Sequence, residues 1–426
     1  MNILITGASG FIGQHLLRAC LDRGHQVSAC VRDPNRLQRY FPEARAVKSD
    51  FSKDHESSIW LERVAGIDVV INAVGIIQQS GRNSFDALHT QAAVALFKAC
   101  EMTNVGKVIQ ISALGADDSA FSQYHLSKKA ADDYLSTLDL DWIILRPSIV
   151  YGPGAKSMRL FQALAALPCT PLLGTGEQLI QPIHIDDLSS AVLALVESDT
   201  IQPQRINVVG PSPVTVKTLY SLLKSWQGNT QASFINIPYQ LALTAAQFGS
   251  MFNNTTVNPE TLKMLAKGNT GDVYAFVELF GFTPQSMQQA LYRRPPLQSE
   301  LLDAKLYFLL PLLKFSLALL WIATGFISVF GYPVESSYTM LQQVGVPAFL
   351  MPITLYSAAT LDIALGLALL ISYQLRLALL LQILTVVIYT LIISISMPEL
   401  WLHPFGPITK NIPLLVSTFV LLRLAK

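Results

Sequence analysis

The sequence predicts an α/β domain with a doubly wound parallel sheet and a small second lobe, followed by an all-α domain of four transmembrane helices. Three observations carry this prediction. A glycine-rich turn follows the first apolar segment, strand-like and helical segments alternate after it, and long apolar stretches follow residue 300. The 426 residues suit two or three domains, and a content of 51% hydrophobic and 14% charged residues excludes both a disordered chain and a wholly soluble enzyme.

The apolar half of the chain is marked by its lack of charge. Of the 30 basic and 29 acidic side chains, only 10 lie in residues 301–426. The formal net charge of +1 provides no field that would attract nucleic acid, so we predict no nucleic-acid partner.

The four cysteines have no C-x-x-C spacing, so we interpret them as core residues of a reduced, intracellular domain and predict no metal site. The chain begins with a strand-like segment instead of a signal peptide, so we expect the first domain in the cytosol.

Four apolar stretches, at roughly 306–330, 349–372, 377–397 and 405–422, approach the ~20 residues that a transmembrane helix requires. Basic residues flank one side of them: Arg293, Arg294 and Lys305 precede the first, Arg376 separates the second from the third, and Arg423 and Lys426 follow the fourth. The opposite loops contain Lys410, Glu335 and Glu399. Because basic flanks stay in the cytosol, we predict a multi-pass protein of a bacterial-type cytoplasmic membrane, with the N-terminal domain and the C-terminus cytosolic.

One carboxylate lies inside these stretches. Asp362 is near the middle of the second stretch, where an ionised group costs roughly 2.5 to 3.5 kcal/mol. It forms either a proton, ion or quinone site or a structural contact between helices, for which the candidate partners are Lys314, Gln382 and Tyr389. Three aromatic residues are interpreted as interface anchors or packing residues: Trp321, Tyr356 and Trp401.

The first strand-like segment, 2–6, leads into Gly7-Ala8-Ser9-Gly10-Phe11-Ile12-Gly13 and then into an apolar-periodic helix. Glycines at this spacing let the backbone turn tightly and approach a pyrophosphate, which then lies at the amide groups and positive dipole end of the helix. Further strand-like segments, which alternate with helical ones, lie at 26–31, 45–49, 67–73, 107–112 and 142–145. We therefore predict a dinucleotide site that includes Gly7, Ser9, Gly10, Phe11, Ile12 and Gly13.

The end of the second strand-like segment bears on the choice of dinucleotide. Arg32 stands where an acidic side chain would bind a ribose 2′-hydroxyl, and Arg36 follows nearby. Because arginine suits a 2′-phosphate, we predict that Arg32 and Arg36 bind NADP(H) in preference to NAD(H). The alternative is that Asp33 binds the ribose and that Arg32 is a solvated surface residue.

Two later strand ends are expected to complete the cofactor cleft. Asp50 and Phe51 follow the third strand-like segment and are predicted to meet the adenine. The fourth ends with Asn72, Ala73, Val74 and Gly75, which we expect to line the cleft.

A catalytic group is predicted from three further residues. Ser112 closes the fifth strand-like segment, and Tyr124 and Lys128 follow at a spacing that places them on one helix face. The Lys128 ammonium is expected to lower the pKa of the Tyr124 phenol and to bind the nicotinamide ribose. Tyr124 then exchanges a proton and Ser112 orients the substrate oxygen.

Residues 1 to about 290 resemble the short-chain dehydrogenase/reductase superfamily, in its extended or atypical, NAD-dependent epimerase/dehydratase-like branch with a Rossmann-type sheet. The resemblance is carried by 6–13, Asp50, 72–75, Ser112, Tyr124 with Lys128, 146–154 and 184–187. It implies that the glycines bind the pyrophosphate, that Tyr124 and Lys128 serve proton transfer and ribose binding, and that Pro147 lies beside the nicotinamide. His184 and Asp187 are interpreted as structural, in a segment that packs the small lobe of such relatives against the nucleotide domain.

Two narrower resemblances concern parts of the chain. Residues 111–116 resemble members related to the nucleotide-binding accessory subunit of respiratory complex I, several of which bind NADP(H) without evident turnover. Residues 314–316, 321–325 and 362–366 resemble a DoxX-like four-helix membrane domain, whose relatives have been linked to quinone-coupled redox chemistry. The predicted domains are an NAD(P)-binding domain at 1–290 with a substrate lobe within 151–290, a proline-containing linker at 291–304 and a membrane domain at 305–426. Within the lobe we expect a strand at 206–209 and helices at 214–226 and 238–250.

The leading functional hypothesis is a membrane-anchored NADP(H)-dependent oxidoreductase that acts on a carbonyl or alcohol of a lipid-soluble substrate, such as a quinone, isoprenoid or sterol-like molecule. The bilayer raises the local concentration of such a substrate at the cleft. The principal alternative is a non-catalytic NADP(H)-binding sensor or accessory subunit of a membrane protein complex. Sugar-nucleotide epimerisation fits the motifs but not Arg32, and an ion transporter would need more intramembrane polar groups than Asp362 and its neighbours provide.

Overall fold

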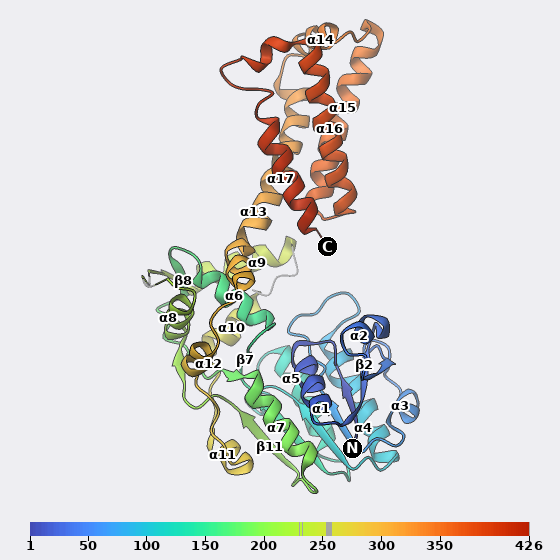
Figure 1. Ribbon diagram of the computed structural model, residues 1–426, viewed down its shortest axis with the longest axis vertical. Coiled ribbons are helices and arrows are strands. Elements are labelled where there is room, and N and C mark those ends of the chain that lie inside the picture. The colour runs from blue at the N-terminus through green and yellow to red at the C-terminus, as the bar shows by residue number, and fades with distance from the viewer. Residues whose placement is uncertain (230, 232, 253–257, 426) are drawn as a thin grey trace. The chain divides into compact units, whose positions relative to one another are not determined.

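The computed structural model describes residues 1–229, 231, 233–252 and 258–425. The chain divides into two compact units, Met1–Ala304 and Lys305–Lys426. This division falls within helix α13 (Gln298–Phe326), and each unit has hydrophobic clusters of its own (Figure 1).

The first unit is built on a sheet of seven strands. In chain order they are β1 (Asn2–Thr6), β2 (Gln26–Val31), β3 (Arg45–Lys48), β4 (Val69–Asn72), β5 (Lys107–Ile111), β6 (Trp142–Pro147) and β11 (Gln204–Val208). Their order across the sheet is β11-β6-β5-β4-β1-β2-β3, and every neighbouring pair is parallel. The chain reverses its progress across the sheet between β1 and β4, which is where doubly wound folds bind ligands. The predicted doubly wound parallel sheet is confirmed.

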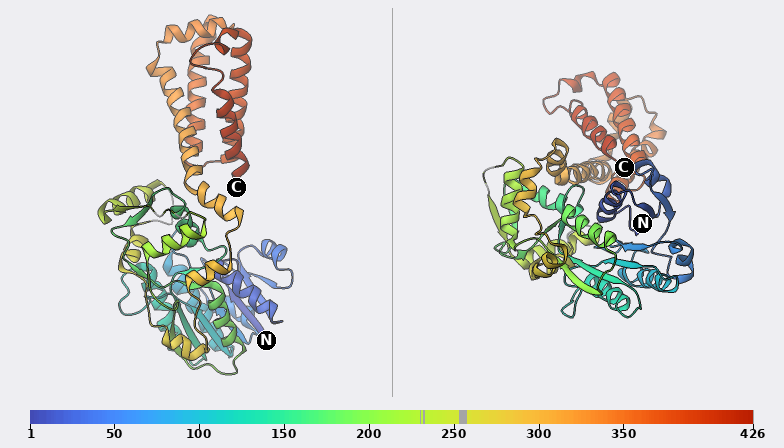
Figure 2. Two further views of the ribbon diagram at one scale, coloured as in Figure 1. Left: turned by 60° about the vertical axis from the view of Figure 1, so that its left-hand side comes forward. Right: turned by 60° about the horizontal axis from the view of Figure 1, so that its bottom comes forward.

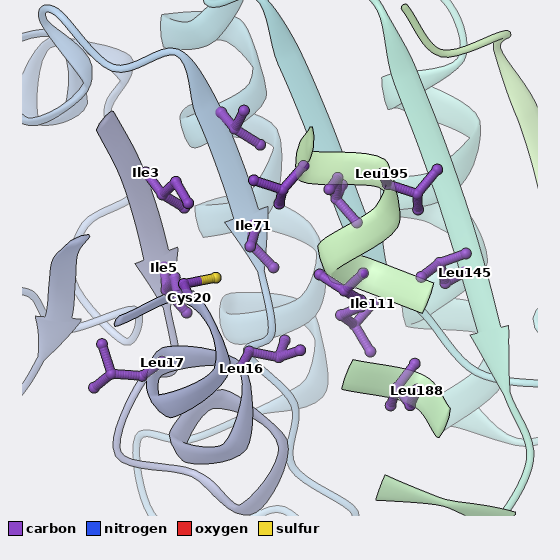
Figure 3. Packing of buried hydrophobic residues seen from close by; sticks show 14 of the residues in the cluster. Ile3, Ile5, Leu16, Leu17, Cys20, Ile71, Ile111, Leu145, Leu188 and Leu195 are labelled. Atoms are coloured by element: carbon purple, nitrogen blue, oxygen red, sulfur yellow. The ribbon is translucent and has the colours of Figure 1, made fainter. Parts of the chain in front are cut away.

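Helices cover both faces of this sheet (Figures 1 and 2). Those that pack on it are α1 (Phe11–Asp22), α2 (Pro34–Tyr40), α3 (Ser57–Val64), α4 (Ala92–Met102), α5 (Gln123–Leu135), α7 (Ile185–Glu197) and α11 (Tyr274–Phe280). On one face, Leu16 of α1 and Leu188 of α7 belong to the same buried cluster as Ile3 and Ile5 of β1, with Leu16 on the β1 side and Leu188 on the side of Ile111 and Leu145 (Figure 3). On the other face, α3, α4 and α5 pack against Leu4. Successive strand side chains point to opposite faces, so β1 contributes to both clusters.

One strand belongs to a different layer from the one predicted. The strand expected at 206–209 within the small lobe is β11, which pairs in parallel with β6 at the edge of the seven-stranded sheet. Ile206 and Val208 are buried in the same cluster as β1 and α7. The physical reason is that these apolar side chains are covered only when the strand extends the sheet under α7 and α11.

The small lobe is assembled from segments that follow β6. Its strands are β7 (Val150–Tyr151), β8 (Thr170–Leu173), β9 (Leu179–Ile180), β10 (Ile183–His184), β12 (Val214–Thr215) and β13 (Phe234–Ile237). Its helices are α6 (Lys156–Ala165), α8 (Val216–Trp226), α9 (Tyr239–Phe252), α10 (Pro259–Lys267) and α12 (Met287–Arg293). The strands form pairs β7 with β10, β8 with β13 and β9 with β12. The core of the lobe includes Tyr151, Met158, Leu172 and Leu219. Helices α8 and α9 correspond to those expected at 214–226 and 238–250.

The second unit is a helical bundle. It comprises most of α13, then α14 (Val334–Gln343), α15 (Met351–Leu370), α16 (Leu375–Ser396) and α17 (Asn411–Leu424). Three segments of the described chain are long and apolar enough to cross a membrane: Gln298–Gly331, Ala348–Leu370 and Leu375–Ser396. The fourth stretch forms α17, whose 14 residues would extend about 21 Å, less than the ~30 Å hydrocarbon core.

Hydrogen bonds bring the basic ends of this bundle together. The Lys314 ammonium donates to the Leu370 carbonyl at 3.4 Å, and the Arg376 guanidinium donates to the Ala425 carbonyl at 3.0 Å. The start of α13 in the bundle, the turn between α15 and α16 and the end of α17 therefore share one end of the unit. Lys314 is thus not the partner of Asp362 that the sequence suggested.

The middle of the bundle contains close helix contacts. A Cβ atom at Gly325 of α13 would lie 2.6 Å from the Ala359 carbonyl oxygen of α15 and 3.2 Å from the Asp362 Cβ, so glycine permits this approach. Within the described residues, the Asp362 Oδ1 atom is buried without a hydrogen-bond partner, and the Gln382 amide donates to the Leu365 carbonyl instead. Trp321 is only 4% exposed and is therefore a packing residue.

Candidate active site

The glycine turn lies between β1 and α1, beside the loop that follows β4. Gly7 has φ +68°, a left-handed conformation that favours glycine, and a Cβ atom there would lie 2.8 Å from the Ala73 carbonyl oxygen. A Cβ atom at Gly13 would overlap the Gly7 carbonyl oxygen. Only glycine fits these two positions, because the backbone of the turn packs directly against the loop after β4 and against the first turn of α1. A tight turn of this kind can cradle a pyrophosphate.

The start of α1 offers donors to this cradle. Gly10 precedes the helix and provides no side-chain cap, while its own N–H donates to the Gly7 carbonyl at 2.8 Å. Because the first amides of a helix have no intrahelical acceptor, Phe11, Ile12 and Gly13 can donate to an anion. Ser9 is exposed beside them. The residues predicted to bind the pyrophosphate are thus brought together in one turn.

The segment after β2 contains the charged residues Arg32, Asp33 and Arg36, for which the sequence left two interpretations. The Asp33 carboxylate accepts the Arg36 N–H at 3.1 Å and caps helix α2. Arg32 and Arg36 are both exposed at this strand end. Asp33 therefore has a structural use as a helix cap, although it is exposed like the two arginines.

Asp50 follows β3 and is held in a local turn. Its carboxylate accepts the Ser52 hydroxyl at 2.8 Å and the Ser52 N–H at 3.1 Å. Burial acts to raise the pKa of Asp50, but the Ser52 hydrogen bonds and the charges of Lys53 and Arg32 outweigh it and lower this pKa. Phe51 is 7% exposed and packs edge-on against Trp60, so its side chain belongs to the core. Only its backbone remains available to an adenine.

A row of buried polar side chains crosses the carboxyl ends of three strands. The Thr6 hydroxyl of β1 donates to the Asn72 side-chain oxygen of β4 at 2.6 Å, and the Asn72 amide donates to the Gln110 side-chain oxygen of β5 at 2.8 Å. These residues are neighbours in the sheet register, Thr6 with Asn72 and Asn72 with Gln110. The row fixes the orientation of Asn72 at the point where the strand order reverses.

Lys128 and Tyr124 lie on α5 beside this row. The Lys128 ammonium is buried and donates to the Val74 carbonyl at 2.8 Å and to the Ile111 carbonyl at 3.0 Å, which are at the ends of β4 and β5. An ammonium has three donors, so one is left for a ligand. A Cβ atom at Gly75 would lie 3.4 Å from this ammonium, so Gly75 leaves the approach to Lys128 clear.

The pKa values of this pair are set mainly by burial. Burial lowers the pKa of Lys128 to about 8, although the Asp132 charge acts in the opposite direction. Burial and the Asp132 charge raise the pKa of Tyr124 to about 12. This direction is opposite to the one expected from the sequence, because removing the phenol from water disfavours its anion more than the ammonium stabilises it.

Pro147 and the expected structural pair lie near the small lobe. Pro147 is buried at the end of β6, where its carbonyl accepts the Leu114 N–H at 2.9 Å. His184 caps α7 by accepting the Asp186 N–H at 3.2 Å, and the Asp187 carboxylate accepts the Gln285 N–H at 3.0 Å. These contacts fasten the end of the lobe to α7.

Two family models match the chain. A model described as NAD(P)H-binding matches residues 7–163, and a model described as the DoxX-like family matches residues 318–419. The chain thus joins a region similar to the NAD(P)H-binding family to a region similar to the DoxX-like family. The glycine turn lies within the first of these regions.

Similar proteins have several activities. The ceramide reductase of Caulobacter vibrioides (strain NA1000 / CB15N) is 30% identical over 202 residues, which cover 47% of this chain and 62% of that protein. The mitochondrial NADH dehydrogenase (ubiquinone) 1 alpha subcomplex subunit 9 of Arabidopsis thaliana is 26% identical over 253 residues, which cover 57% of this chain and 61% of that protein. The chain thus spans about three fifths of the length of these curated relatives.

The solved structures establish the fold of the NAD(P)H-binding domain. UDP-glucuronic acid 4-epimerase from Bacillus cereus, in complex with UDP-glucuronic acid and NAD, is 21% identical with a TM-score of 0.51. The match covers 72% of this chain and 99% of that one. The domain is therefore epimerase/dehydratase-like in fold.

Behind the predicted pair, the NAD(P)H-binding domain contains a histidine that the sequence did not reveal. His89 lies in a π-helical turn (Asp86–Gln91) and is 1% exposed. Its Nε2 atom accepts the Ile76 N–H at 3.0 Å, so the ring proton is on Nδ1, which donates to the Ser127 hydroxyl at 2.9 Å. Burial lowers the pKa of His89 to about 2, which keeps the ring neutral. The ring contacts Tyr124 edge-on and fastens the loop after β4 to α5.

A buried carboxylate is the second group that sequence reasoning missed. Asp132 is fully buried on α5 and accepts the Ser112 hydroxyl at 2.5 Å. A signal was present, since Tyr124, Lys128 and Asp132 recur every four residues and so share one helix face. The lobe adds Glu260, whose carboxylate accepts the Tyr124 N–H at 3.3 Å. No pattern in the sequence connects Glu260 to Tyr124, because the two lie far apart in the chain.

Proposed function

We propose that this chain is a membrane-anchored NADP(H)-dependent oxidoreductase that acts on the carbonyl or alcohol of a lipid-soluble substrate. The observation that carries the proposal is the buried Lys128 ammonium, held between the ends of β4 and β5, with Tyr124 one helical turn before it and Ser112 at the end of β5. This grouping provides a proton donor, a cation and a hydroxyl at the carboxyl ends of β4 and β5.

The chemistry follows from these three groups. NADPH, if held by the glycine turn and Lys128, would provide the hydride for the carbonyl carbon. Tyr124 donates its phenolic proton to the carbonyl oxygen, and Lys128 returns a proton to the phenolate before regaining one from water. The products are an alcohol and an oxidised nicotinamide. A Tyr124 pKa of about 12 keeps the phenol protonated at neutral pH, which favours reduction over oxidation.

The preference for NADP(H) is supported by the segment after β2. Arg32 and Arg36 are exposed there, and the Asp33 carboxylate is engaged as the cap of α2. A 2′-phosphate would find two guanidinium groups at this strand end, and one oxygen of the Asp33 carboxylate is already used by the cap of α2.

A lipid-soluble substrate is supported by the membrane domain and by the apolar surroundings of the site. Ile77 is 47% exposed in the loop fastened by His89, and Phe121 is 43% exposed just before Tyr124. The C. vibrioides relative is named a ceramide reductase, and we extend to this chain only the class of substrate, a lipid carbonyl or a quinone. Attachment to the bilayer would raise the concentration of such a molecule near the cleft.

The same basic residues that share one end of the bundle support the membrane topology. Lys314, Arg376 and the end of α17 with Arg423 lie at that end. We propose that this end, the NAD(P)H-binding domain and the C-terminus face the cytosol of a bacterial-type cell, with the chain in the cytoplasmic membrane.

The test is the NADPH fluorescence of full-length protein in lipid nanodiscs, before and after addition of long-chain ketones or a total lipid and quinone extract. Decay of the signal is expected with wild type and with the control Tyr134→Phe, which changes a tyrosine of the same helix outside the site. Tyr124→Phe is expected to bind NADPH without decay. Turnover that survives Tyr124→Phe would exclude this assignment.

A second candidate is a non-catalytic NADP(H)-binding sensor or accessory subunit of a membrane complex. It is favoured by the similarity to the A. thaliana NADH dehydrogenase subunit and by the Ser112 hydroxyl, whose proton is engaged by Asp132. Stable NADPH binding without consumption, for every substrate and for wild type and Tyr124→Phe alike, would support this candidate instead.

A further inference from the structure

The Ser112 hydroxyl has its single proton directed away from the cleft. It donates to the Asp132 carboxylate over an oxygen-to-oxygen distance of 2.5 Å, which is in the range of a charge-assisted hydrogen bond. A hydroxyl has one donor and two acceptor positions. While Asp132 takes that donor, Ser112 can only accept a hydrogen bond from a substrate.

The remainder of the network fixes Asp132 as an acceptor. The Gln110 side-chain amide donates to the other Asp132 oxygen at 3.4 Å, because its own oxygen is already used by the Asn72 amide. The Asn72 oxygen in turn accepts the Thr6 hydroxyl. Every donor in this row therefore points toward Asp132, and Gln110 and Ser112 donate to different oxygens of its carboxylate.

Charged groups surround Asp132 from three elements. Lys128 lies one turn earlier on the same helix, and Tyr124 one turn before that. From β6, the Arg146 Nε atom lies 3.8 Å from the carboxylate, and its Nε and Nη2 atoms have no hydrogen-bond partner in the described chain. From β11, Arg205 bonds the Asp132 backbone carbonyl and the Asp133 carboxylate. Burial raises the pKa of Asp132 to about 6, despite the Ser112 hydrogen bond and the charges of Lys128 and Arg146.

We propose that Asp132 is a positioning residue that sets the direction of the Ser112 hydrogen bond, so that its protonated form admits a carbonyl substrate and its ionised form admits the alcohol. The inference rests on the proposed oxidoreductase function. A protonated Asp132 donates a hydrogen bond to the Ser112 oxygen, and the Ser112 hydroxyl is then free to donate a hydrogen bond to a carbonyl oxygen. An ionised Asp132 accepts the hydrogen bond of the Ser112 hydroxyl, and the Ser112 oxygen then accepts a hydrogen bond from the hydroxyl of an alcohol.

The first experiment needs no turnover. Infrared spectra of full-length protein in nanodiscs, taken as wild type minus Asp132→Asn, isolate the C=O band of the protonated Asp132 carboxyl group. This band is expected at pH 5 and is expected to disappear as the pH rises through about 6. The difference spectrum of Asp133→Asn, which alters the neighbouring solvent-exposed carboxylate, should show no such band.

The second experiment measures kcat/KM for reduction of hexadecan-3-one with NADPH and for oxidation of hexadecan-3-ol with NADP+. Wild-type reduction is expected to fall about tenfold per pH unit above pH 6, and oxidation to rise until pH 6 and then level off. Asp132→Asn should remove this transition from both profiles. Asp132→Glu, which keeps a titratable carboxyl group, should retain a transition, and Asp133→Asn should behave as wild type.

Two results would overturn the inference while the oxidoreductase proposal stands: a carboxyl group that stays in one protonation state from pH 5 to pH 8, or profiles of wild type and Asp132→Asn that coincide. Absence of wild-type turnover at every pH, with NADPH bound, would overturn the oxidoreductase proposal and this inference with it. A band that titrates together with a transition lost only in Asp132→Asn would support it.

Discussion

Replacement of Asp132 by asparagine should make the NAD(P)H-binding domain more stable at alkaline pH relative to wild type. The side chain is fully buried, and burial raises its pKa from 3.8 to about 6. The folded state therefore binds the proton more tightly than the unfolded chain. The sign follows: the stability that this proton contributes is present below about pH 4 and is lost as the pH rises to about 6.

The magnitude follows from the size of the shift. A change of about 2 pKa units corresponds to about 3 kcal/mol, which wild type loses when Asp132 is fully ionised and which asparagine cannot lose. Between pH 5 and pH 8 the difference between variant and wild type should increase by about 1.5 kcal/mol, because part of the loss has already occurred at pH 5. The contributions of changed hydrogen bonds to Ser112 and Gln110 do not depend on pH in this range and cancel in the comparison.

The assay is urea titration of full-length protein in detergent followed by pulse proteolysis, with the fragment of the first unit quantified at pH 5, 6, 7 and 8. Asp133→Asn is the matched control, because that carboxylate is 42% exposed and pairs with Lys129 and Arg205. A stability difference that is constant with pH, or one that decreases as the pH rises, would refute the reasoning. The second result would mean that Arg146 and Lys128 stabilise the ionised carboxylate more than burial destabilises it.

Four further predictions concern the cofactor turn, the cofactor preference, the buried histidine and the membrane topology. Gly13→Ala should raise the Kd for NADPH roughly 5- to 100-fold in a fluorescence titration, because overpacking that displaces the turn costs roughly 1–3 kcal/mol and a factor of ten is about 1.4 kcal/mol. Arg32→Ala should weaken NADPH binding and leave NADH binding unchanged, and equal losses for both would contradict a 2′-phosphate contact. His89→Ala should lower kcat, since the Ile76 N–H and α5 lose their link, and it should destabilise the domain by about 1–3 kcal/mol; unchanged kinetics would show that the loop is held by other contacts. In a background in which the exposed Cys169 is replaced by serine, Glu335→Cys should react with an impermeant maleimide in intact cells. Tyr373→Cys in the same background should react only after lysis.

The fold was predictable because its signals are local or periodic. Glycines at three-residue spacing, apolar strand segments and apolar stretches of transmembrane length each occupy one short window of sequence. The predictions for the glycine turn, the strand-end Asn72 and the pair Tyr124 and Lys128 rest on local signals of the same kind. The strand β11 was assigned to the wrong layer because an apolar strand does not specify its partner. Only the tertiary structure shows that it extends the sheet beside β6.

The buried groups that contact Tyr124 and Ser112 were harder to predict from the sequence. His89 acts through a contact with Ser127, 38 residues later, and Glu260 reaches Tyr124 from 136 residues away. The direction of the Tyr124 pKa was also wrong, because spacing indicates that Lys128 is near but not how much water the fold removes from the phenol. Asp132 was the exception, since its position on the helix face of Tyr124 and Lys128 was visible and its burial was not.

The polar row gives a physical reason why cofactor and substrate sites are joined in this domain. It begins at Thr6, the last residue before the glycine turn, crosses Asn72 and Gln110, and ends at Asp132 and Ser112. Each bond donates toward Asp132, which accepts from Gln110 on one oxygen and from Ser112 on the other. A proton added to Asp132 releases the Ser112 hydroxyl without disturbing the bonds nearer to the cofactor, since the other carboxylate oxygen still accepts from Gln110. In the proposed mechanism, the bonds nearer to the glycine turn therefore stay fixed while one proton changes the hydrogen bonding of Ser112.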